Sequence, residues 1–163
     1  MSFNANEILE IAVQIERNGM SFYRRASEHA GSEANREMLL DLASMEADHE
    51  QTFLDLQAAL AAAPSGSQLI RDSDEETMQF IRSVADGHVF DVAIDPVKIL
   101  TGEETPREIL STAIGLEKET IVYYAALEQI IIDEPARKKI LDVIREEMTH
   151  VAQLSGQRAA LVD

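Results

Sequence analysis

Apolar residues recur every three or four positions along four long stretches of the chain, which is the spacing of amphipathic helices. The pattern predicts helices over residues 5–29, 33–62, 106–132 and 134–161. The residues between these stretches agree with it, because Gly31 and Ser32 are typical of a helix end followed by an N-cap. Thr105 and Pro106 likewise predict a helix start. The first two helices are joined so closely that they must be antiparallel neighbours.

A stretch of about forty residues, 64–104, separates the second predicted helix from the third and has no long periodicity of its own. Within it, residues 74–85 predict a short helix and residues 97–100 a single turn. A connection of this length suits a crossover that runs the length of a helix bundle. The sequence therefore predicts one all-α domain over residues 1–163, in which two helix hairpins are joined by a long crossover with a short extra helix.

Acidic and imidazole side chains interrupt the apolar side of each long helix. Each predicted hairpin holds one Glu-x-x-His unit, which places a carboxylate and an imidazole one turn apart on the same face of a helix. A further glutamate lies thirty positions before each unit, on the buried side, where an unpaired charge is costly. These candidate metal ligands are Glu16, Glu46 and His49 in the first hairpin, and Glu117, Glu147 and His150 in the second.

The two ligand sets are related by one constant offset of 101 residues, and the offset aligns more than the ligands. Ala12 aligns with Ala113, and the pair at 22–23 aligns with the pair at 123–124. The simplest account is two hairpins related by a pseudo-twofold axis, which brings two equal ligand sets face to face. Chance matching of helix-forming residues would explain the apolar matches but not six polar residues at one offset.

The composition excludes several classes of function. The net charge is −16, whereas nucleic acids and anionic membrane surfaces require a basic patch on their partner. Cysteine is absent, which excludes disulfides, thiol chemistry and an iron–thiolate site. No apolar run approaches the roughly 20 residues of a membrane span, and the first residues do not read as a signal peptide. We expect a cytoplasmic protein.

The chemistry of the ligand set favours two metal ions over one. Four glutamates and two neutral histidines supply four negative charges, which two divalent cations would balance inside a low-dielectric core. Mixed carboxylate and imidazole ligation suits iron, manganese or zinc. Two carboxylates that bridge the ions would leave open positions for dioxygen or peroxide, and this favours iron with redox chemistry.

This ligand set resembles that of the ferritin-like superfamily, and the segment from Glu16 to Tyr23 looks most like the rubrerythrin di-iron domain. The resemblance implies a ferritin-like four-helix bundle that holds two iron ions. It implies one ion at Glu16 and His49, the other at Glu117 and His150, and bridges at Glu46 and Glu147. It also implies that Tyr23 and Tyr124 form hydrogen bonds to ligand carboxylates across the bundle. Plain core packing is the alternative for both tyrosines.

The sequence departs from the rubrerythrin pattern in two ways. A chain without cysteine has no rubredoxin-like domain, and Thr120 stands where rubrerythrin carries an extra glutamate. The six-residue set is closer to the symmetric centre of bacterioferritin, yet Ala47 replaces the methionine that would ligate haem. Only 13 residues follow His150, too few for the helix that builds ferritin cages. We therefore expect a homodimer.

Three functions are compatible with these residues. The leading hypothesis is a peroxidase or ferroxidase, in which ferrous ions reduce H2O2 or O2 and an unknown external donor returns the electrons. The second hypothesis is a non-catalytic protein that binds or handles iron. The third is a structural bundle whose charged core has lost its use.

Overall fold

The computed structural model describes residues 5–63, 75–85 and 99–161. They form five helices, so the predicted all-α fold is confirmed. The helices are α1 (Ala5–Ser27), α2 (Glu33–Ala62), α3 (Glu75–Ala85), α4 (Pro106–Ile130) and α5 (Glu134–Ala160). The long helices begin and end within about two residues of the predicted bounds, as expected for frayed ends. Of the predicted crossover, residues 64–74 and 86–98 lie outside the described part.

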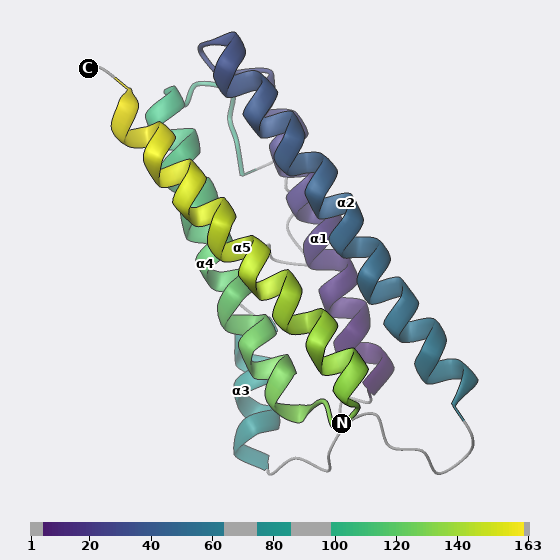
Figure 1. Cartoon of the computed structure of the whole chain (residues 1–163). Helices are drawn as coiled ribbons and strands as arrows, with labels where there is room; N and C mark the ends of the chain where they lie inside the picture. The colour runs from purple at the N-terminus through teal and green to yellow at the C-terminus, as the bar shows by residue number, and fades with distance from the viewer. Residues whose placement is uncertain (1–4, 64–74, 86–98, 162–163) are drawn as a thin grey trace.

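The four long helices form a bundle of two antiparallel hairpins, α1 with α2 and α4 with α5 (Figure 1). The two tight connections lie at opposite ends of the bundle, so α1 runs antiparallel to α4 as well (Figure 1). Contacts between the hairpins are made by α1 with α4 and by α2 with α5. The short helix α3 packs on α4. This arrangement is the one that a twofold axis perpendicular to the bundle would produce.

The turn between α1 and α2 depends on a glycine. Gly31 has a φ of 76°, a conformation that side chains disfavour. A Cβ atom at this position would also lie 2.5 Å from the Cγ of Pro106, at the start of α4. Ser32 then caps α2, because its hydroxyl accepts a hydrogen bond from the backbone N–H of Asn35. The glycine therefore sets both the turn and the close approach of the second hairpin.

The second hairpin also begins where its capping residues require. The Thr105 hydroxyl accepts from the backbone N–H of Glu108, whose carboxylate accepts in return from the backbone N–H of Thr105, which completes a capping box. Asp133 caps α5 by accepting from the backbone N–H of Ala136 at 3.0 Å. None of the described helices is both long and apolar enough to cross a lipid bilayer.

The core of the bundle is apolar toward both ends and polar in the middle. Leucine, isoleucine, valine, alanine and aromatic side chains from the four long helices fill most of it. At the midpoint of each helix, however, charged and imidazole side chains are buried with them. Burying charge in this way is costly without a partner, so the middle of the bundle is where a function is to be sought.

Candidate metal centre

All six predicted ligands meet in the middle of the bundle. Each long helix supplies one or two of them, and each side chain lies on the face that its helix turns toward the opposite hairpin. Their residues are at most 3% exposed. They form two groups in which the candidate ligand atoms lie within 4.8 Å of one another. The groups are Glu16, Glu46, His49 and Glu147 on one side, and Glu46, Glu117, Glu147 and His150 on the other.

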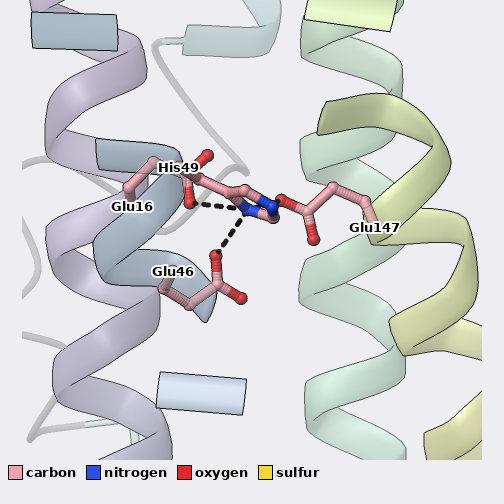
Figure 2. A group of neighbouring side chains, drawn as sticks. All are labelled: Glu16, Glu46, His49 and Glu147. Carbon is pink, nitrogen blue, oxygen red and sulfur yellow. Dashed lines mark ion pairs between the residues drawn. The ribbon is translucent and has the colours of Figure 1, made fainter. Parts of the chain in front are cut away.

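Glu147 lies between the two imidazoles. Its Oε1 is 3.0 Å from Nδ1 of His49, and its Oε2 is 2.8 Å from Nδ1 of His150. Figure 2 shows His49 extending from α2 across the bundle toward this carboxylate on α5. The two rings stack with centroids 5.7 Å apart. One carboxylate therefore offers one oxygen atom to each half of the centre.

Glu46 repeats this arrangement from the other hairpin. Its Oε2 is 3.5 Å from Nδ1 of His49, and its Oε1 is 3.7 Å from Nδ1 of His150. The remaining glutamates each face one imidazole. Oε2 of Glu16 lies 3.7 Å from Nδ1 of His49 (Figure 2), and Oε1 of Glu117 lies 3.5 Å from Nδ1 of His150. The geometry thus separates two carboxylates that serve both halves from two that serve one half each.

Two tyrosines connect the hairpins at the same level. The hydroxyl of Tyr23, on α1, donates to Oε1 of Glu117 on α4. In the same way, the hydroxyl of Tyr124, on α4, donates to Oε1 of Glu16 on α1. Burial and the neighbouring carboxylates raise the pKa of both phenols, so each hydroxyl keeps its proton and remains a donor. Each tyrosine therefore orients a glutamate of the opposite hairpin.

Crowding of carboxylates shifts their proton affinities in opposite directions. Burial, and then the charge of Glu147, raises the pKa of Glu117 to about 8. Burial and the charges of Glu147, Glu117 and Glu16 raise the pKa of Glu46 well above its ordinary range. Glu147 differs, because burial would raise its pKa but the adjacent His150 and His49 lower it to about 2. Without a cation, the centre therefore retains protons that neutral solution would otherwise remove.

The histidines are affected by the same charges. Burial would lower the pKa of His150, but the neighbouring Glu117 and Glu147 raise it to about 9. Burial likewise opposes protonation of His49, yet Glu147, Glu16 and Glu46 together raise the pKa of that ring. A cluster of four carboxylates thus attracts positive charge strongly enough to protonate both imidazoles in the absence of another cation.

The donor atoms fit a pair of metal ions. Several of them are buried and have no hydrogen-bond partner among the described residues, which is uncommon in folded proteins. These atoms are Oε2 of Glu16, both carboxylate oxygens of Glu147, Nδ1 of His49, and Nδ1 and Nε2 of His150. Carboxylate oxygen and imidazole nitrogen are ligands for iron, manganese and zinc. Two groups that share two carboxylates could therefore hold two ions side by side.

Comparison with known proteins supports the fold. A solved structure from Thermotoga maritima, described as a candidate ferritin-like diiron-carboxylate protein, matches the chain with a TM-score of 0.71. It is 24% identical in sequence, and the match covers 98% of this chain and 97% of that one. The fold is ferritin-like. The predicted fold class is thus confirmed.

The first half of the ferritin-like bundle also matches a protein family. Residues 7–84 match the family model of rubrerythrin, so the predicted resemblance is confirmed over this segment. The segment contains Glu16, Glu46 and His49, whereas the second hairpin lies outside it. The internal repeat is what connects the ligands of that hairpin with the matched half. No curated protein matches the chain closely enough to count as a relative.

The ferritin-like bundle also places residues at the centre whose surroundings the sequence alone did not indicate. Nε2 of His49 contacts Oε2 of Glu146, which follows no apolar pattern. Gly19 lies against Glu46, and a Cβ atom there would be 3.4 Å from its Cγ and Cδ. The hydroxyl of Thr120 is buried and has no hydrogen-bond partner in the described part of the chain. At the offset of 101, Glu146 corresponds to Met45 and Gly19 corresponds to Thr120, so the internal repeat carried no signal for these positions.

Proposed function

We propose that the chain is a di-iron carboxylate oxidoreductase of the peroxidase or ferroxidase type, which reduces H2O2 or O2. The observation that supports it most directly is the pair of ligand groups sharing Glu46 and Glu147. Each of these two carboxylates directs one oxygen at His49 and the other oxygen at His150. A site for a single ion would not need this arrangement. Four carboxylates and two neutral histidines also balance the charge of two divalent cations.

In this proposal the ligands divide into terminal and bridging residues. Glu16 and His49 would hold one ion, Glu117 and His150 the other, and the shared pair would bridge them. Bound ferrous iron would supply the electrons: two of them, with two protons, convert H2O2 into two molecules of water. An external donor would then return the electrons. The same residues could bind manganese or zinc, but these ions would not supply electrons to H2O2 as ferrous iron does.

The surrounding residues prepare the centre for this role. Tyr23 and Tyr124 hold the terminal carboxylates in place through their hydroxyl groups. Burial of all six ligands keeps bulk water away and strengthens each electrostatic interaction there. The raised pKa of Glu117 allows its carboxylate to hold a proton near neutral pH when a cation is absent. Metal binding would release such protons, which couples loading of the centre to pH.

The test combines elemental analysis with peroxide consumption. We expect the purified wild-type chain to bind two irons and to consume H2O2 in their presence. Glu46→Ala should lose both irons, His150→Ala should lose the iron that this histidine would hold, and both variants should lose activity. Glu37→Ala is the matched control, because this exposed glutamate of α2 lies away from the ligand groups. Retention of iron and activity in the first two variants would show that the ligands are assigned wrongly.

The same experiment separates the second candidate, a protein that binds or hands on iron without catalysis. The absence of cysteine leaves the chain without an iron–thiolate electron carrier of its own, which favours this alternative. It predicts reversible binding of two irons with negligible peroxide turnover, even when a reductant is supplied. Turnover that depends on both bound irons would exclude it.

A further inference from the structure

The two histidines of the centre are held differently. Nε2 of His49 lies 2.8 Å from Oε2 of Glu146, while its Nδ1 faces the centre. The side chain of Glu146 is 52% exposed, whereas that of His49 is 3% exposed. A carboxylate on the outer nitrogen of a ligand histidine fixes the orientation of the ring and makes the inner nitrogen a better ligand. One buried ligand is therefore connected to solvent through a single glutamate.

The internal repeat provides the comparison for this contact. The counterpart of Glu146, at the offset of 101, is Met45, whose thioether is at most a weak acceptor. Nε2 of His150 is accordingly buried without a hydrogen-bond partner among the described residues. His150 itself is 0% exposed. Two ligands that are equivalent by sequence thus differ in support and in their connection to solvent.

A groove lies outside His49, between α2 and α5. Its volume is about 480 Å³, and both His49 and Glu146 line it. The other charged residues of its lining are three aspartates and one lysine: Asp48, Asp55, Asp142 and Lys139. Four carboxylates against one ammonium give the groove a negative potential, which concentrates cations at its floor.

The positions equivalent to the lining of this groove carry different residues. At the offset of 101, its positions carry Thr149 for Asp48, Gly156 for Asp55 and Met38 for Lys139. With Met45 in place of Glu146, Asp41 is the one carboxylate that the corresponding set keeps. The acidic lining therefore belongs to the His49 side of the bundle and is not a general property of this acidic chain.

We propose that divalent cations reach the centre through the groove between α2 and α5, and that Glu146 is the positioning residue of this entry route. The ion beside His49 is then the one that exchanges with solvent, whereas the ion beside His150 is retained. A half-exposed carboxylate can contact a cation in the groove and the imidazole at its floor in turn. The inference rests on the proposed function, since it requires that the six buried residues hold two ions.

The first test measures the affinity of the metal-free protein for Co²⁺. The absorption of the bound ion reports binding, and a chelator competes for the ion. In Glu146→Gln, which keeps the size of the side chain but removes its charge, one of two ions should lose affinity by roughly 10- to 100-fold. The other ion should be unaffected. Met45→Glu supplies the missing carboxylate on the opposite side, and it should strengthen binding of the second ion. Circular dichroism checks that each variant keeps its helices.

The second test measures release of bound Co²⁺ to excess EDTA. The wild-type protein should release its two ions in two phases. His49→Ala should lack the fast phase, and His150→Ala should keep it. This outcome would identify the exchanging ion independently of any catalytic activity.

The third test measures the rate of Co²⁺ association at several salt concentrations. The triple variant Asp48→Asn, Asp55→Asn and Asp142→Asn should bind more slowly and with a weaker dependence on salt, because steering by charge is screened by salt. The matched control removes three exposed carboxylates elsewhere on α2, namely Glu33→Gln, Glu37→Gln and Asp41→Asn. It changes the net charge equally and should leave the association rate close to that of the wild type.

The outcomes separate this inference from the function beneath it. If the wild-type chain binds no Co²⁺, both fail. If it binds two ions, but Glu146→Gln weakens both equally or the two triple variants behave alike, the entry route is wrong and the two-ion centre stands. Loss of the fast phase in His150→Ala instead of His49→Ala would assign the exchanging ion to the opposite side and overturn the inference.

Discussion

The hairpins α1–α2 and α4–α5 carry the same ligands but surround them differently. Each supplies one terminal glutamate, one shared glutamate and one histidine, and each sends a tyrosine hydroxyl to the glutamate of the other. Beyond these residues the repeats diverge. Gly19 corresponds to Thr120, and Met45 corresponds to Glu146. Under the proposed function, the comparison teaches that the matched residues would hold the ions, while the unmatched residues would set how each half is reached and supported.

Substitution of a shared carboxylate should have the largest effect on metal content, and it tests the division into shared and terminal ligands. Glu147→Gln removes a charge that lies between both imidazoles, so we expect loss of both ions. Glu16→Gln removes a charge that faces one imidazole, so we expect loss of one ion. Metal content per chain, measured by elemental analysis, distinguishes the two results. Equal losses in the two variants would contradict the division into shared and terminal ligands, and Glu37→Gln controls for a change of surface charge.

Removal of the metal should make the stability of the bundle depend on pH. Glu117 has an ordinary pKa of 4.5 and a folded pKa of about 8. Between these values the folded state holds a proton that the unfolded state has lost. Its stabilising contribution is therefore complete below the ordinary pKa and is lost as the pH rises through the folded one. His150, raised from 6.5 to about 9, acts in the same direction at higher pH. Glu147 does not oppose this trend, because its pKa of about 2 lies below the window.

Thermal unfolding of the metal-free and metal-loaded forms between about pH 5.5 and pH 7.5 measures this effect. We expect the melting temperature of the metal-free form to fall as the pH rises. The loaded form should not fall with it, since metal binding improves as its ligands lose protons. The difference in melting temperature between the two forms should therefore increase as the pH rises. A gap that is absent at every pH would indicate a bundle whose stability does not involve metal.

The tyrosine pair tests whether the two halves support each other equally. Tyr23→Phe and Tyr124→Phe each remove the donor to one terminal glutamate, and each should lower metal affinity by roughly 10- to 100-fold. Tyr123→Phe is the matched control, because its hydroxyl donates to the backbone carbonyl of Ile8 at 3.0 Å and not to a ligand. It should cost about 1 kcal/mol of stability and leave metal binding unchanged. Equal effects of all three variants would mean that the tyrosines serve packing alone.

The ligand groups could be predicted from the sequence for a physical reason. A charged residue on the apolar face of a helix is anomalous, and here the anomaly occurs at Glu16 and recurs at Glu117 at the offset of the repeat. The helix bounds were accessible for a similar reason, because Gly31, Thr105 and Asp133 act through local backbone geometry. Each of these signals can be read along the sequence and needs no knowledge of how the hairpins meet.

Contacts between the hairpins were less accessible. The sequence left two interpretations open for Tyr23 and Tyr124, and the structure contains both hydrogen bonds because the register of α1 against α4 brings each hydroxyl to a carboxylate. Glu146 gave no signal, since it is exposed on α5 and its partner, His49, is on α2. Its contact depends on the distance and angle between two helices that no local pattern encodes.

Two glycines provide the smallest and most controlled test of the comparison. Ala for Gly in a helix stabilises by about 0.5–1 kcal/mol. Gly115→Ala should increase the free energy of unfolding by this amount, because a Cβ atom there would meet nothing within 4 Å among the described residues. Gly19→Ala should gain less in the metal-loaded form than in the metal-free form, because its Cβ would lie in contact with Cγ and Cδ of Glu46, at 3.4 Å, and would narrow the positions open to that shared carboxylate. Urea unfolding of both variants, with and without metal, measures the difference. An equal gain in both forms would show that Glu46 does not use the space that Gly19 leaves beside it.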